Sequence, residues 1–306
     1  VMNALMTPLM MIVRSGEIDL AVYRWPHSAE KPTLVLVHGY PDSASVWDGL
    51  ANELGDRFNV VAYDVRGAGR SGKPKPVSAY ALPQLVADLK AVIDAVSPAQ
   101  PVHLVGHDWG SIQAWEAVVD DTLRSRIASY TTISGPSLDH AGHWLAERLR
   151  SKEPARIKQA LRQLAHSWYI GLFQLPLIAP TLWRSGLAKH WTSWLAWREG
   201  VSTTPSATQA SDGATGVKLY RANVRGRLGK ARPRATDLPV QLIVPLRDAY
   251  VLPDLTEDLQ RWAPRLWRRE IDAGHWVQLS HPHEIASWIA EFAGFVDGRQ
   301  YNEYSE

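Results

Sequence analysis

Short, mostly apolar runs, each too short for a typical helix, most constrain how this chain can fold. They lie at residues 33–37, 59–63 and 102–105. Continuous apolar runs of this length are typical of strands buried on both faces of a parallel sheet. The amphipathic segment 82–96 separates two of them and predicts a helix that crosses from one strand to the next. The sequence therefore predicts a mostly parallel central sheet flanked by helices.

The pattern changes in the middle of the chain and then resumes. Strand-like runs continue at 127–134, 240–244 and 266–271, but no convincing buried strand lies between 137 and 235. Helical patterns dominate that stretch, at 144–151, 155–169, 181–198 and 216–224. We predict a core domain formed by residues 1–135 and 236–306, with an all-helical lid (cap) domain at 136–235. The segment 225–234, here called the basic loop, has five basic residues and no acid. It is interpreted as a solvated hinge loop.

Composition narrows the functional classes. The chain has 306 residues, a net charge of +2 and no cysteine. We therefore expect no nucleic-acid partner, no disulfide and no cysteine-based metal site. The chain has no apolar run of about 18 residues and no evident signal peptide, so we expect a cytoplasmic protein without a membrane span. We expect no metal and no cofactor, and a monomer or a homodimer.

A glycine-flanked aspartate follows one of the predicted strands. The segment Gly106-His107-Asp108-Trp109-Gly110 lies between the run at 102–105 and a helical segment. Glycine on both sides of a nucleophile, at a strand-to-helix turn, is the pattern of a nucleophile elbow. The nucleophile is commonly serine, but a carboxylate there can attack an electrophilic carbon, as in an epoxide or an alkyl halide, and form an ester. The alternative is an ordinary turn with a solvated aspartate.

Two more polar residues follow later strands. Asp248 comes after the strand at 240–244, and His275 comes after the strand at 266–271. The order Asp108, Asp248, His275 is that of an α/β-hydrolase triad, in which the histidine activates water and the acid orients the imidazole. Taken singly, Asp248 could be a turn residue and His275 a structural histidine. Asp64 also follows a strand, but too early in the chain for the acid.

Ester hydrolysis also needs donors for an oxyanion. The segment His38-Gly39-Tyr40-Pro41 follows the first buried strand. The backbone N–H groups of Tyr40 and of Trp109, the residue after the nucleophile, are the expected donors.

Together these motifs resemble a known family. The segments 38–41, 64–71 and 106–110 look like those of the epoxide hydrolase branch of the α/β-hydrolase superfamily. The resemblance runs over residues 16–135 and 237–296. It is strongest to actinobacterial epoxide hydrolases, including those fused to a short-chain dehydrogenase. It implies hydrolysis of an epoxide by water to a vicinal diol, through an alkyl ester on Asp108.

The resemblance also assigns residues in the lid. Two tyrosines that hold the epoxide oxygen match Tyr169, in Tyr-x-x-x-Phe-Gln-x-Pro, and Tyr220, in Tyr-Arg-Ala-Asn. A phenol can donate a hydrogen bond, and then a proton, to the alkoxide that ring opening leaves. The other expected substrate contacts are His38, Pro41, Trp168 and Phe173. The Trp-rich lid favours an apolar or aromatic epoxide.

Other functions share parts of this pattern. A haloalkane dehalogenase would use the same Asp108, Asp248 and His275, but its members commonly have Asn at the position of Tyr40. A fluoroacetate-type dehalogenase would have arginines just after the nucleophile, and a serine esterase would have serine at the elbow. A catalytically silent ligand sensor of the same fold would usually lack part of the set.

Overall fold

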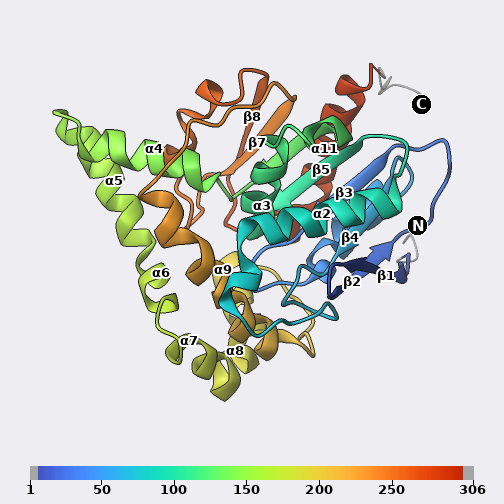
Figure 1. The fold of residues 1–306 in the computed structure, drawn as a ribbon, viewed down its shortest axis with the longest axis horizontal. Coiled ribbons are helices and arrows are strands. Elements are labelled where there is room, and N and C mark those ends of the chain that lie inside the picture. The colour runs from blue at the N-terminus through green and yellow to red at the C-terminus, as the bar shows by residue number, and fades with distance from the viewer. Residues whose placement is uncertain (1–5, 299–306) are drawn as a thin grey trace.

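One eight-stranded sheet forms the centre of the molecule (Figure 1). The computed structural model describes residues 6–298. The strand order is β1-β2-β4-β3-β5-β6-β7-β8; β1 and β2 run antiparallel to their neighbours and the other strands are parallel. The strands are β1 Leu9–Ser15, β2 Ile18–Arg24, β3 Thr33–Val37, β4 Asn59–Tyr63, β5 Val102–His107, β6 Ile127–Ile133, β7 Val240–Pro245 and β8 Leu266–Ile271. The predicted fold class is confirmed.

Helices cover both faces of this sheet. Figure 1 shows α2 and α3 crossing in front of the strands, and α1 packs against α11. Every residue of β3, β4 and β5 is buried, as the apolar runs predicted. The core helices are α1 Asp48–Leu54, α2 Leu82–Val96, α3 Trp109–Val118, α10 Val277–Ser280 and α11 Pro282–Val296. Short 3₁₀ turns occur at Ala44–Trp47, Val77–Tyr80, Arg124–Arg126, Pro253–Thr256 and Leu259–Arg261.

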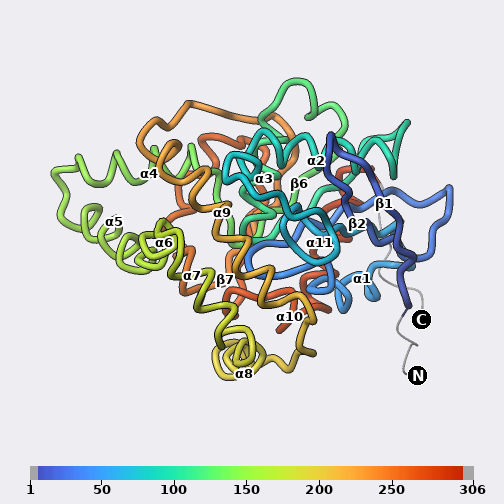
Figure 2. Tube along the Cα trace, turned by 60° about the horizontal axis from the view of Figure 1, so that its bottom comes forward, coloured from blue at the N-terminus to red at the C-terminus, as the bar shows by residue number. Residues whose placement is uncertain are grey.

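Only helices lie between β6 and β7, as predicted (Figure 2). They are α4 Leu138–Leu149, α5 Pro154–His166, α6 Trp168–Phe173, α7 Ile178–Leu182, α8 Ala188–Glu199 and α9 Gln209–Leu228. The single helix expected at 181–198 is instead broken by a π-helical turn at Trp183–Leu187, where Gly186 leaves helical geometry. Glycine has low helix propensity, so a break there is physically reasonable. The lid boundaries at 136 and 235 stay a prediction. Residues 1–5 and 299–306, at the outer ends of the predicted core domain, lie outside the described residues.

The sequence pattern missed β1. This strand pairs along its whole length with β2 alone, so it is an edge strand. Leu9, Met10 and Ile12 are exposed, and the burial of β1 therefore does not follow the apolar residues of its sequence.

The prediction that the basic loop is a solvated hinge is wrong, because residues 225–228 form the end of α9 and three of the five basic residues bind buried carboxylates. Arg234 donates to the Glu116 carboxylate at 2.6 Å, and Arg232 donates to Asp139 at 2.9 Å. Arg227 lies 3.3 Å from both carboxylates. Glu116 and Asp139 are buried, so the positive charges of the loop compensate buried negative charges of α3 and α4.

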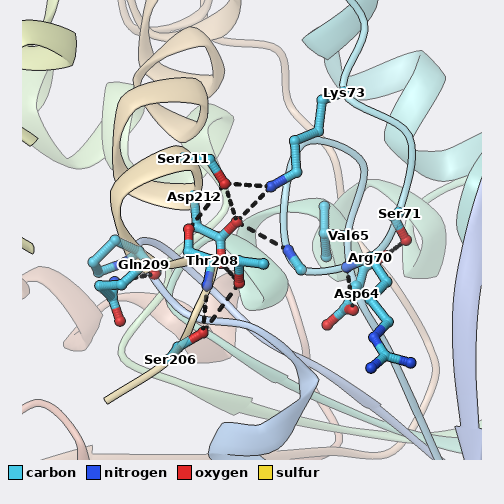
Figure 3. A network of polar contacts seen from close by, with 12 residues as sticks. Asp64, Val65, Arg70, Ser71, Lys73, Ser206, Thr208, Gln209, Ser211 and Asp212 are labelled. Carbon is cyan, nitrogen blue, oxygen red and sulfur yellow. Dashed lines mark hydrogen bonds and ion pairs between the residues drawn. The ribbon is translucent and has the colours of Figure 1, made fainter. Parts of the chain in front are cut away.

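A second polar cluster joins the lid to the core at the start of α9 (Figure 3). Asp212 accepts hydrogen bonds from the Lys73 ammonium at 2.8 Å and from the Gly69 backbone N–H at 3.0 Å. The Thr208 hydroxyl donates to the second carboxylate oxygen of Asp212 at 2.6 Å. The Asp212 side chain is only 2% exposed, so this cluster holds the lid to the loop after β4.

Candidate active site

The nucleophile candidate sits at a strained turn. β5 ends at His107, α3 begins at Trp109, and Asp108 between them has a φ of 53°. A non-glycine residue in this region costs about 1–3 kcal/mol, and such strain is concentrated at functional sites. A Cβ on Gly106 would meet the backbone of Ser111 at 2.6 Å, and a Cβ on Gly110 would collide with the carbonyl group of Val37. The glycines therefore permit the close packing that the turn requires.

Asp108, Asp248 and His275 converge at the carboxyl end of the sheet. The imidazole Nδ1 of His275 lies 2.9 Å from Asp248 Oδ2, and its Nε2 lies 3.6 Å from Asp108 Oδ2. The backbone N–H groups of Tyr250 and Val251 donate to Asp248 Oδ1 at 2.8 and 3.1 Å. Two backbone N–H groups thus hold the Asp248 carboxylate in place. The carboxylate in turn orients the imidazole of His275 so that its Nε2 faces Asp108.

The two carboxylates set the protonation state of the imidazole. Burial alone would lower the pKa of His275, but the charges and hydrogen bonds of Asp248 and Asp108 raise it to about 10. Burial likewise favours the neutral form of Asp248, but His275 and the backbone donors hold the pKa of this carboxyl below its usual value. The two carboxylates therefore favour the protonated form of His275.

The predicted oxyanion donors lie beside Asp108. The Tyr40 N–H donates to Asp108 Oδ1 at 2.8 Å. Trp109 is the first residue of α3, so its N–H has no acceptor within the helix. The Tyr40 side chain is fixed by the lid, because its hydroxyl donates to the Gly213 carbonyl at 3.0 Å and accepts from the Trp183 indole at 2.6 Å.

Both lid tyrosines face the same site. The rings of Tyr169 and Tyr220 are 6.0 Å apart, and Tyr220 lies 4.9 Å from the Trp109 ring. Burial, followed by the negative charge of Asp108 and other nearby groups, raises the pKa of both phenols well above the ordinary value. The two phenols therefore stay protonated and remain able to donate hydrogen bonds.

Two cavities meet at this cluster. The larger has a volume of about 710 Å³ and the smaller about 280 Å³. Asp108, Tyr169, Tyr220 and Tyr250 line both, so the Asp108 carboxylate lies where the cavities join. Most of the other lining side chains are apolar or aromatic, which suits an apolar ligand with one reactive polar group.

The larger cavity includes three of the four further substrate contacts that the sequence suggested. Pro41, Phe173 and Trp168 line it, and Trp168 is 69% exposed. His38 does not line it, which contradicts the predicted contact. Its Nδ1 lies 2.9 Å from the Gly39 carbonyl oxygen, and its Nε2 accepts from the Val65 N–H at 2.9 Å. Both ring nitrogens are thus engaged with loop backbone.

Asp64 is also outside the cavities around Asp108. Its carboxylate accepts from the backbone N–H groups of Ala44 and Arg70, both at 2.8 Å, and from the Tyr23 hydroxyl at 3.0 Å. Asp64 holds two loops together and does not orient a histidine.

Several lining residues were missed by the sequence reasoning. Tyr250 packs between His275 and Tyr169, with ring centroids 4.9 and 5.5 Å away. Its position two residues after Asp248 was an available signal. Trp276, which follows His275, and Arg198, at the end of α8, also line the larger cavity. For Arg198 no local sequence signal exists, because only the path of the lid brings α8 to the site.

The model of the alpha/beta hydrolase fold family matches residues 32–282, which include the sheet from β3 onward, the lid and the residues of the candidate triad. The chain belongs to this family. The match spans the strands on both sides of the helical segment between β6 and β7.

The relatives that the chain resembles carry two kinds of name. The chain is 42% identical over 295 residues to the probable oxidoreductase EphD of Mycobacterium tuberculosis, an alignment of 92% of this chain and 49% of that protein. It thus spans about half the length of that relative. It is 26% identical to epoxide hydrolase 3 of Xenopus tropicalis, over 85% of this chain and 71% of that protein.

A solved structure shows the same fold. The epoxide hydrolase of Bacillus megaterium superposes with a TM-score of 0.76 at 18% identity, over 92% of this chain and 99% of that one. No helix within residues 6–298 is long and apolar enough to cross a membrane.

Proposed function

We propose that this hydrolase converts an epoxide and water to a vicinal diol through an ester on Asp108. The observation that carries the proposal is a carboxylate at the elbow that lies beside an imidazole and lines both cavities together with two protonated phenols. Several relatives and fold neighbours have epoxide hydrolase in their names, which supports the same chemistry. The name oxidoreductase belongs to a relative about twice as long as this chain, and we do not assign an oxidoreductase activity to the chain.

In the first step, an Asp108 oxygen attacks an epoxide carbon and the carbon–oxygen bond of the ring breaks. Tyr169 and Tyr220 hydrogen-bond the developing alkoxide, and one phenol gives it a proton. The imidazolium of His275 supplies the proton that restores this phenol. The products are a hydroxyalkyl ester on Asp108 and a neutral His275.

Ester formation itself prepares the second step. It removes the negative charge of Asp108, which is one of the causes of the high pKa of His275. The pKa of His275 therefore falls, and the neutral imidazole can take a proton from water. The resulting hydroxide attacks the ester carbonyl carbon, and the N–H groups of Tyr40 and Trp109 stabilise the oxyanion. The ester bond breaks, the diol takes the proton of the carboxylic acid, and Asp108 with protonated His275 is restored.

The test traps the ester. His275→Gln removes the base of the second step but keeps the nucleophile and both phenols. One phenol proton is enough for a single ring opening, so the ester should form and its hydrolysis should stop. We expect intact-protein mass spectrometry after incubation with styrene oxide to show an adduct with the mass of the whole epoxide. The double variant Asp108→Asn with His275→Gln is the control and should show no adduct.

The same experiment separates the alternatives. A chloroalkane adduct that has lost its halide, without an epoxide adduct, would identify a haloalkane dehalogenase instead. An epoxide adduct that persists in the double variant would show that Asp108 is not the nucleophile. If wild type neither hydrolyses a panel of epoxides nor forms adducts in the single variant, the proposed function is wrong and the ligand-sensor alternative is favoured.

A further inference from the structure

One permanent cation lies on the wall of the larger cavity, far along the chain from the triad. Among the described residues that line this cavity, Arg198 is the only lysine or arginine. The cavity is otherwise lined mainly by apolar and aromatic side chains, among them Leu172, Leu182 and Trp191. Arg198 belongs to the last turn of α8, and it both lines the cavity and is exposed to solvent.

The guanidinium of Arg198 has no partner within residues 6–298. No ion pair or hydrogen bond of its side chain occurs in this part of the chain, although arginines elsewhere, such as Arg148, bind carboxylates. The adjacent Glu199 does not neutralise Arg198 through direct contact; it accepts instead from the Trp276 backbone N–H at 3.3 Å. A guanidinium offers five N–H donors in a geometry that matches carboxylates and phosphates.

Arg198 is electrostatically connected to the reaction site. Burial raises the pKa of the Tyr250 phenol, the charge of Arg198 lowers it, and the charges of Glu199, Asp248 and Asp108 raise it further. Tyr250 in turn packs on His275 with ring centroids 4.9 Å apart. A ligand in the larger cavity can therefore extend from Asp108, past apolar walls, to the Arg198 guanidinium.

We propose that Arg198 is a specificity residue that selects epoxides carrying an anionic group at the far end of an apolar chain. The inference rests on the proposed epoxide hydrolysis and adds the class of substrate. Arg198 takes no part in bond making; its guanidinium hydrogen-bonds a carboxylate or another anion while the apolar chain fills the cavity. The smaller cavity, on the other side of Asp108, has no lysine or arginine among its lining residues and accepts an uncharged substituent.

The test uses matched pairs of substrates. Terminal epoxyalkanoic acids of increasing chain length are compared with their primary amides, which have nearly the same shape but no charge. The measured quantity is the ratio of kcat/KM for acid and amide. We expect wild type to prefer the acid at one chain length, and Arg198→Gln to lower that ratio about two- to fivefold, as for other solvent-exposed ion pairs. Added salt should reduce the preference of the wild type in the same direction.

Arg184→Gln is the control variant. Arg184 is also an exposed arginine of the lid, but it does not line either cavity, so its substitution should leave the ratio at the wild-type value. If Arg198→Gln leaves the ratio unchanged, or Arg184→Gln lowers it equally, the inference is wrong while epoxide hydrolysis stands. If wild type turns over neither acids nor amides nor simple epoxides, the proposed function fails and the inference fails with it.

Discussion

At the scale of single residues, the site depends on charges that are held close together. His275 lies between Asp248 and Asp108, which raise its pKa to about 10 although burial alone would lower it. Asp108→Asn removes one of the two negative charges, so we expect the pKa of His275 to fall clearly below that of the wild type. The titration of the imidazole, followed by ¹⁵N NMR, measures this change. Glu53→Gln alters a distant surface carboxylate that pairs with His283 and should leave the value unchanged. An unchanged pKa in Asp108→Asn would contradict the proposed activation of His275 by ester formation.

At the scale of elements, the basic loop shows how one segment stabilises two helices. Arg234 donates to Glu116 of α3, and burial raises the pKa of that carboxyl, so Glu116 depends on its cation to stay charged. We expect Arg234→Gln to lower the free energy of unfolding by about 1–3 kcal/mol, because the buried Glu116 carboxylate loses the nearest of its charged partners, while Arg227 and Arg232 remain 3.3 and 3.5 Å away. Urea denaturation measures this difference. Arg225→Gln, at an exposed position of α9, should change stability by less than about 0.5 kcal/mol. Equal stability of the two variants would show that the Arg234 pair contributes nothing.

At the scale of the whole molecule, the site is complete only when the lid lies on the core. Asp108 and His275 come from the core and Tyr169 and Tyr220 from the lid, while Asp212 binds Lys73 and the Gly69 N–H across the boundary. We expect Asp212→Asn to weaken this attachment and to speed amide hydrogen exchange in residues 206–216, with less change in β3 to β5. Hydrogen exchange followed by mass spectrometry measures both regions. Ser193→Ala, at an exposed position of α8, is the control and should leave exchange at the wild-type rate. Unchanged exchange in Asp212→Asn would show that the Asp212 contacts do not hold the lid to the core.

Sequence alone determined the parts that depend on local patterns. Apolar runs predicted β3, β4 and β5, because a strand buried on both faces needs apolar side chains throughout. The elbow motif predicted the turn at Asp108, and chain order predicted that Asp248 and His275 would accompany it. These two lie 27 residues apart in the chain, yet their side chains are 2.9 Å apart in the structure. In a parallel sheet the carboxyl ends of the strands lie at the same edge, so residues that follow different strands can be predicted to lie close together.

Tertiary structure alone decided the parts that depend on contacts between distant segments. His38 follows a strand just as Asp108 does, but its ring binds the backbone of Val65 instead of facing the cavity. From sequence the basic loop was predicted to be solvated, because its carboxylate partners, Glu116 and Asp139, lie about a hundred residues earlier in the chain. Arg198 lines the cavity only because the lid helices return to the core. Local periodicity carries no information about which distant side chains meet, so packing of the lid on the sheet settled these contacts.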